Sequence, residues 1–336
     1  RIIMNICANC FNDEEIKQFI ATSSTSIANC DCCGKRSEII DLSELSDFFI
    51  EFLGLFIKDD NGCGLVQLIQ KDWNIFSSDI CARNILSTII DSEQIEFSID
   101  DNVSYSSEIQ NCFSVWEKLK SEVQEEKRYF SDLGSFNWEV YITSNAKIKK
   151  GTFLYRARIT PDGRKKLKTK EMGCPPKERA TAGRANPLGI PYLYLCSKIE
   201  TTFYEVRAVY LDRISVGKFT ILRDLDIVDF SNKISLFYTY SDSESNVSLL
   251  DIVKRKILFE KISTDLSKPL RRFDTEIEYV PTQLICEYCK QNGADGIRFN
   301  SSLHQEGANI VLFNSSDAIC TSVLSREIKN VIIESK

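Results

Sequence analysis

The spacing of hydrophobic residues changes along the 336-residue chain and divides it into regions of different structure. Over residues 41–56 and 114–130, apolar side chains recur three and four positions apart, which is the period of one helix face. From Trp138 onward, β-branched and aromatic runs alternate with Pro and Gly, as in strands joined by turns. We therefore expect helices before a boundary near residues 131–150 and a strand-rich domain after it, with an exposed Ser-rich loop at residues 240–248.

The second half of the chain combines predicted strands with predicted helices. The strands are expected at residues 152–159, 191–197, 217–230, 294–302 and 308–313. The helices are expected at residues 199–211 and 281–293, and the second should end at Gly293. The chain is therefore expected to be an α+β protein.

Composition and charge exclude several classes of protein. Apolar residues make up 43% of the chain and charged residues 27%, which is typical of a folded soluble protein. No uninterrupted apolar run reaches the ~18–20 residues of a membrane helix, and the N-terminus lacks a signal-peptide pattern, so we expect a cytoplasmic protein. A net charge of −6 argues against broad nucleic-acid binding, because such proteins usually present a basic face. An anionic ligand would therefore need a local cluster of arginines.

Two cysteine pairs near the N-terminus have the spacing of a zinc ribbon. Cys7 and Cys10 form the first pair, and Cys30 and Cys33 form the second. Two turns that each present two thiolates can complete a tetrahedral sulfur site for zinc, and a zinc with four protein ligands is structural. Free cysteines in a small core are the alternative, and Cys32 could replace one of its neighbours as a ligand.

His304 is the only histidine, which limits the available chemistry. A catalytic triad or a histidine-dependent RNase would have to use it, and histidine-ligated catalytic metals are excluded. It lies in the stretch SSLHQEGAN, which is predicted to be a mobile connection between two strands, so we do not expect it to be catalytic. The chemistry is therefore expected to depend on Arg, Glu, Tyr and Ser side chains.

Three separated stretches of the second half, LYRAR, GRANPLGIPYLYL and ADGIRFNSSLHQEGANIVLF, collect polar residues that could form such a site. These residues are Arg156 and Arg158 on one strand face, Arg184 on a turn, Tyr194 on the next strand, Glu205 on a helix, and Ser301 and Ser302 at a strand end. Each of them alone is most often a solvated surface residue. Their joint order along the chain is therefore the informative feature.

This joint order resembles the RES domain, a family named after an arginine, a glutamate and a serine. The motifs YR, GRANPLGIPYLYL with the following glutamate, and DGIRFNSS with GANIVLF occur in the family's order, and the resemblance covers roughly residues 150–320. It implies a RES domain over residues 150–325 with a fold similar to ADP-ribosyltransferases, built of mixed or antiparallel sheets with flanking helices. Many RES domains have Trp after the arginine of the GR motif, whereas this chain has Ala185.

Residues 4–130 resemble, more loosely, the N-terminal region that precedes some RES domains and is described as HEPN-like, with cysteine pairs followed by helices. This resemblance implies a zinc ribbon over residues 4–41 and a helical HEPN-like domain over residues 42–135. No RNase activity of the usual HEPN type is expected, because the helical region contains no histidine.

Carried onto this sequence, the name-giving residues are Arg156, Glu205 and Ser301, with Ser302 as the alternative serine. RES domains cleave NAD+, and the resemblance implies the same substrate here. A carboxylate suits the positive charge that develops on the ribose, which implies that role for Glu205, and a guanidinium suits the pyrophosphate, which implies that role for Arg156. Tyr194 can stack on or hydrogen-bond the nicotinamide–ribose end, and Ser301 can hold the substrate through its hydroxyl. The further expected substrate-binding residues are Arg158, Arg184, Asn186 and Ser302.

The expected function is that of an NAD+-degrading enzyme, a glycohydrolase or phosphorylase, and the resemblance implies a bacterial toxin or an anti-phage defence effector. One alternative is an ADP-ribosyltransferase that modifies a macromolecule, and another is a non-catalytic zinc-ribbon protein that binds a nucleotide. The expected metal is a structural zinc. The expected partner is an antitoxin or a regulatory protein, whereas a membrane or nucleic-acid partner is not expected. The acceptor (water, phosphate or protein) and a homo-oligomeric state are left open.

Overall fold

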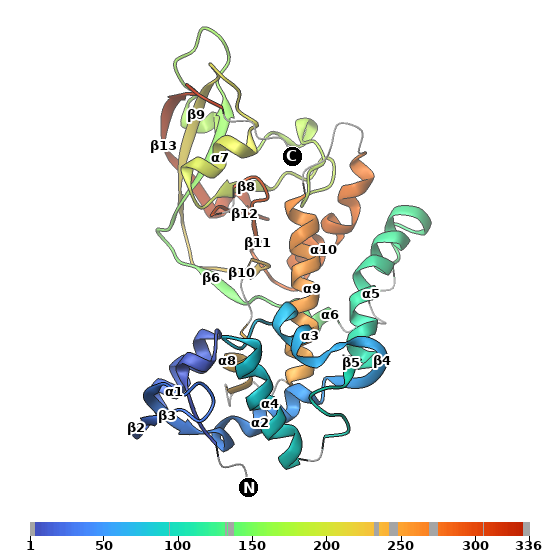
Figure 1. Ribbon diagram of the computed structural model, residues 1–336. Helices are drawn as coiled ribbons and strands as arrows, with labels where there is room; N and C mark the ends of the chain where they lie inside the picture. The colour runs from blue at the N-terminus through green and yellow to red at the C-terminus, as the bar shows by residue number, and fades with distance from the viewer. Residues whose placement is uncertain are drawn as a thin grey trace. The chain divides into compact units, whose positions relative to one another are not determined.

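The computed structural model describes residues 4–93, 95–131, 133, 138–231, 235–241, 248–268, 275–304 and 306–331 (Figure 1). Most of the predicted Ser-rich loop at residues 240–248, and part of the predicted boundary at residues 131–150, lie outside these ranges. The chain forms two compact units, each described below by itself. The first unit comprises Arg1–Ser114 with Lys233–Lys256, and the second comprises Val115–Asn232 with Ile257–Lys336.

The first unit begins with the small sheet that carries the cysteine pairs. Its strand order is β1-β3-β2, and both pairings are antiparallel. The strands are β1 (Asn5–Cys7), β2 (Ser26–Asn29) and β3 (Arg36–Asp41). Helix α1 (Glu14–Ser23) starts at Asp13, whose carboxylate accepts hydrogen bonds from two backbone N–H groups of the first turn. The cysteine pairs that are predicted to bind zinc thus lie on short antiparallel strands and in the turns next to them.

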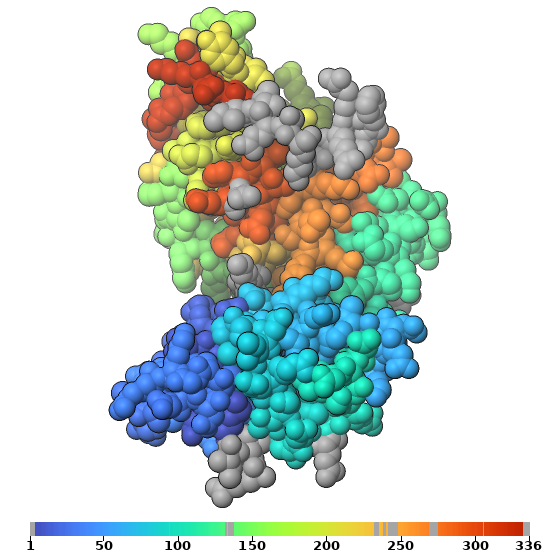
Figure 2. All heavy atoms as spheres, viewed as in Figure 1, coloured from blue at the N-terminus to red at the C-terminus, as the bar shows by residue number. Residues whose placement is uncertain are grey.

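Helices make up most of the remainder of the first unit, and residues 46–93 lie beside the cysteine-bearing sheet in the space-filling view (Figure 2). The helices are α2 (Ser46–Leu53), α3 (Leu65–Asp72), α4 (Asp79–Glu93), α8 (Leu236–Ser241) and the first parts of α5 (Ser107–Ser121) and α9 (Leu249–Ser267). Aromatic rings pack between some of them; Phe48 of α2, for example, packs edge-on against Phe237 of α8 at 5.2 Å between ring centroids.

The prediction of a continuous helical pattern from residue 42 onward is wrong at one place. The helix expected through residue 56 ends at Leu53, and Phe56–Gly64 instead forms strand β4, which pairs with β5 (Asn102–Tyr105). Gly62 allows this close pairing, because a Cβ atom there would lie 2.2 Å from the carbonyl oxygen of Val103. The segment DDNG, rich in turn-forming residues, thus overrides the helical period of the preceding residues.

The second unit is built on a mixed sheet, as the α+β prediction requires. In the described part of this unit the sheet has eight strands in the order β13-β9-β7-β8-β12-β11-β10-β6. Strands β10 and β11 are parallel, and the other neighbours are antiparallel. The strands are β6 (Ala146–Ile148), β7 (Phe153–Ile159), β8 (Leu193–Cys196), β9 (Arg213–Ile221), β10 (Leu225–Asp229), β11 (Gly296–Asn300), β12 (Ala308–Leu312) and β13 (Ala318–Glu327).

Two elements of this unit are shorter than the sequence pattern predicts. The run 217–230, expected as one strand, is divided into the end of β9 and β10. The helix expected over residues 199–211 ends as α7 (Ile199–Glu205), because Arg207 and Leu211 adopt left-handed backbone conformations with φ of 51° and 69°.

Helix α10 (Val280–Gln291) matches its predicted position, and the chain turns after it at Gly293 with φ of 86°.

The sheet opens between β7 and β8, and this opening positions the candidate site. Strand β7 pairs with β9 along Phe153–Ile159, whereas its pairing with β8 is confined to Tyr155 opposite Cys196. Helix α7 packs against both strands at this point. Within the described residues, no helix is long and apolar enough to cross a membrane.

Candidate functional site

Glu205, at the last position of α7, is the centre of a hydrogen-bond network in the second unit. Its Oε1 atom accepts hydrogen bonds from Ser301 Oγ at 3.0 Å and from Asn309 Nδ2 at 2.8 Å. Its Oε2 atom faces Arg184 Nη2 at 3.4 Å. Three donors that are distant in sequence therefore hold one carboxylate. The contact to Oε2 is longer than the two hydrogen bonds to Oε1.

The predicted motifs thus converge in space, although more than a hundred residues separate Arg184 from Asn309 in sequence. Ser301 directly follows β11, and Asn309 lies on β12, which pairs with β11 and places Phe299 opposite Asn309. Both Ser301 and Asn309 are 5% exposed, so their hydrogen bonds to Glu205 are made in largely dry surroundings.

The GRAN turn is held by Tyr194 and by the start of α10. Tyr194 donates its hydroxyl to Asn186 Oδ1 at 2.7 Å and accepts the Ala185 N–H at 3.0 Å. A Cβ atom on Gly183 would lie 2.7 Å from the Tyr194 hydroxyl, so this close approach requires glycine. Thr282 donates to the carbonyl of Arg184 at 2.6 Å, which adds a contact from α10. The turn therefore presents Arg184 toward Glu205 from a rigid support.

Burial raises the pKa of the Tyr194 phenol well above its usual value. Because its hydroxyl is already committed to Asn186 and Ala185, Tyr194 and Asn186 act first as supports for the turn. The same is true of Ser302, which donates to the carbonyl of Ser267 at 2.6 Å rather than to Glu205. These three residues were predicted to touch the substrate, and their hydrogen bonds favour a supporting role.

Arg156 and Arg158 lie on one face of β7, as the period-two pattern predicts, and both donate to the carbonyl of Gly173, at 3.3 Å and 2.6 Å. Burial, together with the neighbouring charge of Arg158, lowers the pKa of the Arg156 guanidinium. The Nε atom of Arg158 is buried without a hydrogen-bond partner among the described residues. The carbonyl that both guanidiniums contact carries no net charge and therefore does not compensate their positive charges. An anionic ligand can do so.

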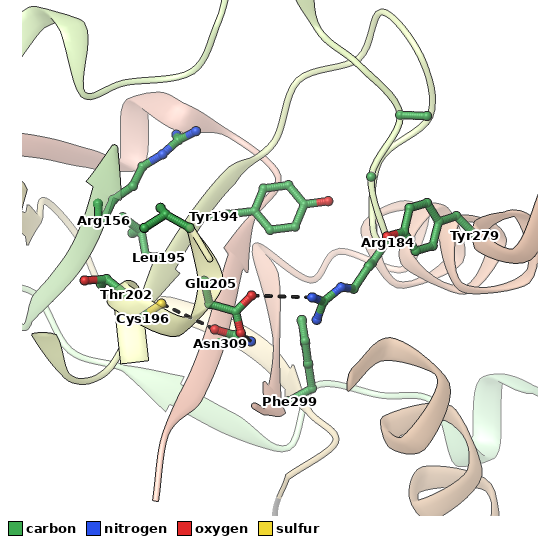
Figure 3. Close-up of a pocket in the computed structure, with 14 residues that line it drawn as sticks. Arg156, Arg184, Tyr194, Leu195, Cys196, Thr202, Glu205, Tyr279, Phe299 and Asn309 are labelled. Carbon is green, nitrogen blue, oxygen red and sulfur yellow. Dashed lines mark hydrogen bonds and ion pairs between the residues drawn. The ribbon is translucent and has the colours of Figure 1, made fainter. Parts of the chain in front are cut away.

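Two cavities meet at Arg156. The first has a volume of about 310 Å³, and in Figure 3 Glu205 and Tyr194 lie between Arg156 on one side and Arg184 on the other. It is lined by Arg156, Ala157, Ala182, Gly183, Arg184, Tyr194, Leu195, Cys196, Thr202, Glu205, Val206, Tyr279, Phe299 and Asn309. The second, of about 580 Å³, shares Arg156, Ala157 and Val206 with the first and adds Arg158 and Arg164. The first cavity thus combines the Glu205 carboxylate with the guanidiniums of Arg156 and Arg184, and the second adds Arg158 and the ion pair of Arg164 with Glu171.

Sequence reasoning missed Asn309 and Cys196. Asn309 accepts the Cys196 thiol at 3.3 Å, and burial, followed by the charge of Glu205, raises the pKa of Cys196 to about 12. Cys196 is therefore a neutral donor that orients the Asn309 amide toward Glu205. A buried asparagine inside the apolar run ANIVLF was the available signal for this role.

His304 lies beside the site, in contact with helix α7. Its ring stacks on Tyr204 at 5.3 Å between centroids, and its Nδ1 lies 2.9 Å from Thr201 Oγ1. It is not among the residues that line either cavity in the described part of the chain. His304 therefore connects the loop that follows Ser301 to helix α7, and this contact indicates a structural role.

The four predicted zinc ligands converge in the first unit. The sulfur atoms of Cys7, Cys10, Cys30 and Cys33 all lie within 4.8 Å of one another, with 3.5 Å between Cys7 and Cys33 and between Cys10 and Cys30. Such sulfur–sulfur separations suit the edges of a tetrahedral zinc site. Gly34, with φ of 72°, turns the chain directly after the second pair.

Comparison with known proteins shows a family match and a likeness to a solved structure. The model of a family described as the RES domain matches residues 153–327, just over half of the chain. The toxin–antitoxin complex MbcT–MbcA of M. tuberculosis contains a chain of similar structure, with 13% identity and a TM-score of 0.30, and the match covers 55% of this chain and 87% of that one. No curated protein sequence matches.

Proposed function

Because the chain belongs to the RES-domain family, which is associated with NAD+-degrading toxins, we propose that its second unit cleaves the nicotinamide–ribose bond of NAD+. The observation that carries the proposal is the carboxylate of Glu205, fixed by Ser301, Asn309 and Arg184 in the wall of a 310 Å³ cavity. A small cavity with a few convergent polar groups is the usual form of a ligand site.

The chemical step follows from the charge that cleavage develops. The bond between the ribose carbon and the pyridinium nitrogen breaks, and its electron pair stays on nitrogen, so neutral nicotinamide leaves. The ribose carbon becomes an oxocarbenium-like cation, and the ionised Glu205 stabilises that cation or orients the ribose hydroxyls through Oε2. Ser301 and Asn309 hold the carboxylate before the charge appears, so little reorganisation is needed in the transition state.

The arginines beside the second cavity suit the remainder of the substrate. The pyrophosphate of NAD+ carries two negative charges, and Arg156 and Arg158 present two partly buried positive charges beside the second cavity. Arg184 lies at the opposite side of the first cavity (Figure 3), next to Glu205, and its pairing with that carboxylate holds both side chains in place. A local cluster of arginines thus reconciles an anionic substrate with a protein of net charge −6.

The acceptor of the ADP-ribose group is identified by the products. Pure protein is incubated with NAD+, with and without inorganic phosphate, and the products are separated and identified by mass. Water as acceptor yields ADP-ribose, phosphate yields a phosphate ester of ADP-ribose, and a macromolecular acceptor yields a covalently labelled protein. Unchanged NAD+ under all conditions would remove the enzymatic proposal and leave a nucleotide-binding protein.

We further propose that Cys7, Cys10, Cys30 and Cys33 bind a structural zinc ion in the first unit. The role of the protein as a toxin or defence effector, and an antitoxin or regulatory partner, are part of the same proposal and are supported by the family. The HEPN-like relationship of residues 42–135 and the ADP-ribosyltransferase-like fold stay proposals as well.

A further inference from the structure

We propose that the first unit holds a second zinc ion, bound by the thiolates of Cys10, Cys32 and Cys81, so that Cys10 bridges the two ions. Cys81 is absent from the paired cysteine motifs, and its place in the fold is what suggests the site. The sulfur atoms of these three residues all lie within 4.8 Å of one another. The group is distinct from the four predicted ligands except for Cys10, which belongs to both.

The fold brings Cys81 to Cys10 through a specific set of backbone contacts. Phe11 and Phe76 form an antiparallel bridge, and the Ser77 N–H donates to the carbonyl of Cys10 at 2.9 Å. Helix α4 then begins at Asp79, which places Cys81 in its first turn. The amino end of a helix favours a negatively charged thiolate, so this position supports metal binding by Cys81.

The three side chains form a buried pocket of soft ligands. Cys10 is 0% exposed, Cys81 6% and Cys32 9%. Thiolates select zinc and other soft metals over the hard cations that carboxylates prefer. Three protein thiolates leave one position of a tetrahedral zinc ion for a water molecule, in contrast to the closed site formed by four cysteines.

Charge balance supports two ions better than one if all six cysteines bind metal. Six thiolates with a single divalent ion would carry a formal charge of −4 in a buried cluster. Two divalent ions reduce this charge to −2, which is the formal charge of an ordinary zinc site with four cysteines. A second ion therefore removes the repulsion that would otherwise arise between the added thiolates and the first site.

The test is the metal content of the full-length chain purified without chelator. We expect two zinc ions per chain in the wild type, and one in Cys81→Ser and in Cys32→Ser, because each removes a ligand of the second site alone. The matched control is Cys112→Ser, since Cys112 is buried in the same unit but belongs to neither group, and it should retain two ions. One ion per chain in the wild type, or two in Cys81→Ser, would overturn the proposal.

A second measurement does not depend on the variants being stable. The metal-free wild-type protein is titrated with Cd²⁺, and the ultraviolet charge-transfer absorbance of the cadmium–thiolate bonds is followed. We expect the absorbance to rise until two equivalents have been added. Saturation at one equivalent would show that Cys32 and Cys81 bind no ion of their own, and would leave the proposed NAD+ chemistry of the second unit unaffected.

Discussion

Ser301 donates its hydroxyl to Glu205 Oε1 at 3.0 Å, across a sequence separation of 96 residues. The neighbouring Ser302 turns away and donates to Ser267. Two adjacent serines of the same motif thus have different partners, and the first is the one coupled to the proposed catalytic carboxylate. The sequence alone left open which of the two serines belongs to the site. Their different partners allow an experiment to decide between them.

Ser301→Ala is expected to lower kcat for NAD+ cleavage about 10–100-fold, because a hydrogen bond to a charged group contributes about 1.5–3 kcal/mol. Ser302→Ala is the matched control and should change kcat less than about 3-fold, since its hydroxyl supports a backbone carbonyl. Steady-state kinetics of both variants measure the difference. Equal losses in the two variants would refute the assignment of Ser301.

Asn309→Asp is expected to move the acid limb of the pH–activity profile toward higher pH. The new carboxylate would lie at the position from which the Asn309 amide now donates to Glu205 at 2.8 Å. Two carboxylates in contact disfavour double ionisation and raise an apparent pKa of the pair, so a higher pH is needed to restore the charge. An unchanged acid limb, measured by kcat/KM between about pH 4 and 8, would argue against contact between the two groups during catalysis.

His304→Ala is expected to lower kcat about 3–10-fold with little change in KM, because it releases the Ser301 loop from Thr201 and Tyr204 on α7. His304→Asn can restore a hydrogen bond to Thr201 and should recover part of the loss. Kinetics with both variants test this positioning role. A loss as severe as that of a catalytic residue, without recovery in His304→Asn, would show that the imidazole itself takes part in the chemistry.

The sequence predicted those parts of the site that depend on local pattern. The shared face of Arg156 and Arg158 follows from strand periodicity, and a helix carrying Glu205 was expected, although it ends at Glu205 instead of continuing to residue 211. The role of Asn309 depends on the pairing of β12 with β8, which sets it opposite Cys196, and no local pattern encodes that register. Cys81 likewise approaches Cys10 through a bridge between distant phenylalanines.

Local patterns also failed where a turn competes with a helix. Residues 41–56 have helical spacing throughout, but the helix ends at Leu53 and the chain enters strand β4, because the pairing of β4 with β5 decides the outcome. The contact of His304 with Thr201 was missed for a similar reason. It depends on the loop folding back onto α7, which its polar sequence does not indicate.

Arg223→Ala is expected to destabilise the second unit by about 1–3 kcal/mol at pH 7. Arg223 donates to Asp295 at 2.6 Å and to Asp317 at 2.9 Å, and the Asp317 side chain is only 8% exposed, so the variant leaves a buried carboxylate without this partner. The matched control Arg164→Ala breaks a pair with the exposed Glu171 and should destabilise the unit much less than Arg223→Ala does. Urea unfolding of each variant gives both values.

The stabilisation by Arg223 should also depend on pH. Partial burial raises the pKa of Asp295, but hydrogen bonds from Arg223 and from the Asp226 N–H outweigh it, and the net shift is downward. A carboxyl group whose pKa is lowered by folding stabilises the folded state above its unfolded pKa of about 4, and this contribution is lost as the pH falls toward the folded value. The difference between wild type and Arg223→Ala should therefore shrink below about pH 4. A constant difference would show that Asp295 does not carry the effect.

The most direct test of the proposed chemistry is the rate at which nicotinamide is released from NAD+ by Glu205→Gln. Glutamine keeps the shape of the side chain but removes the charge that meets the ribosyl cation, so we expect kcat to fall about 100–1000-fold while KM changes little. Glu200→Gln, on the exposed side of the same helix, is the matched control and should release nicotinamide at the wild-type rate. Release by Glu205→Gln at the wild-type rate would contradict the central claim that this carboxylate drives the cleavage.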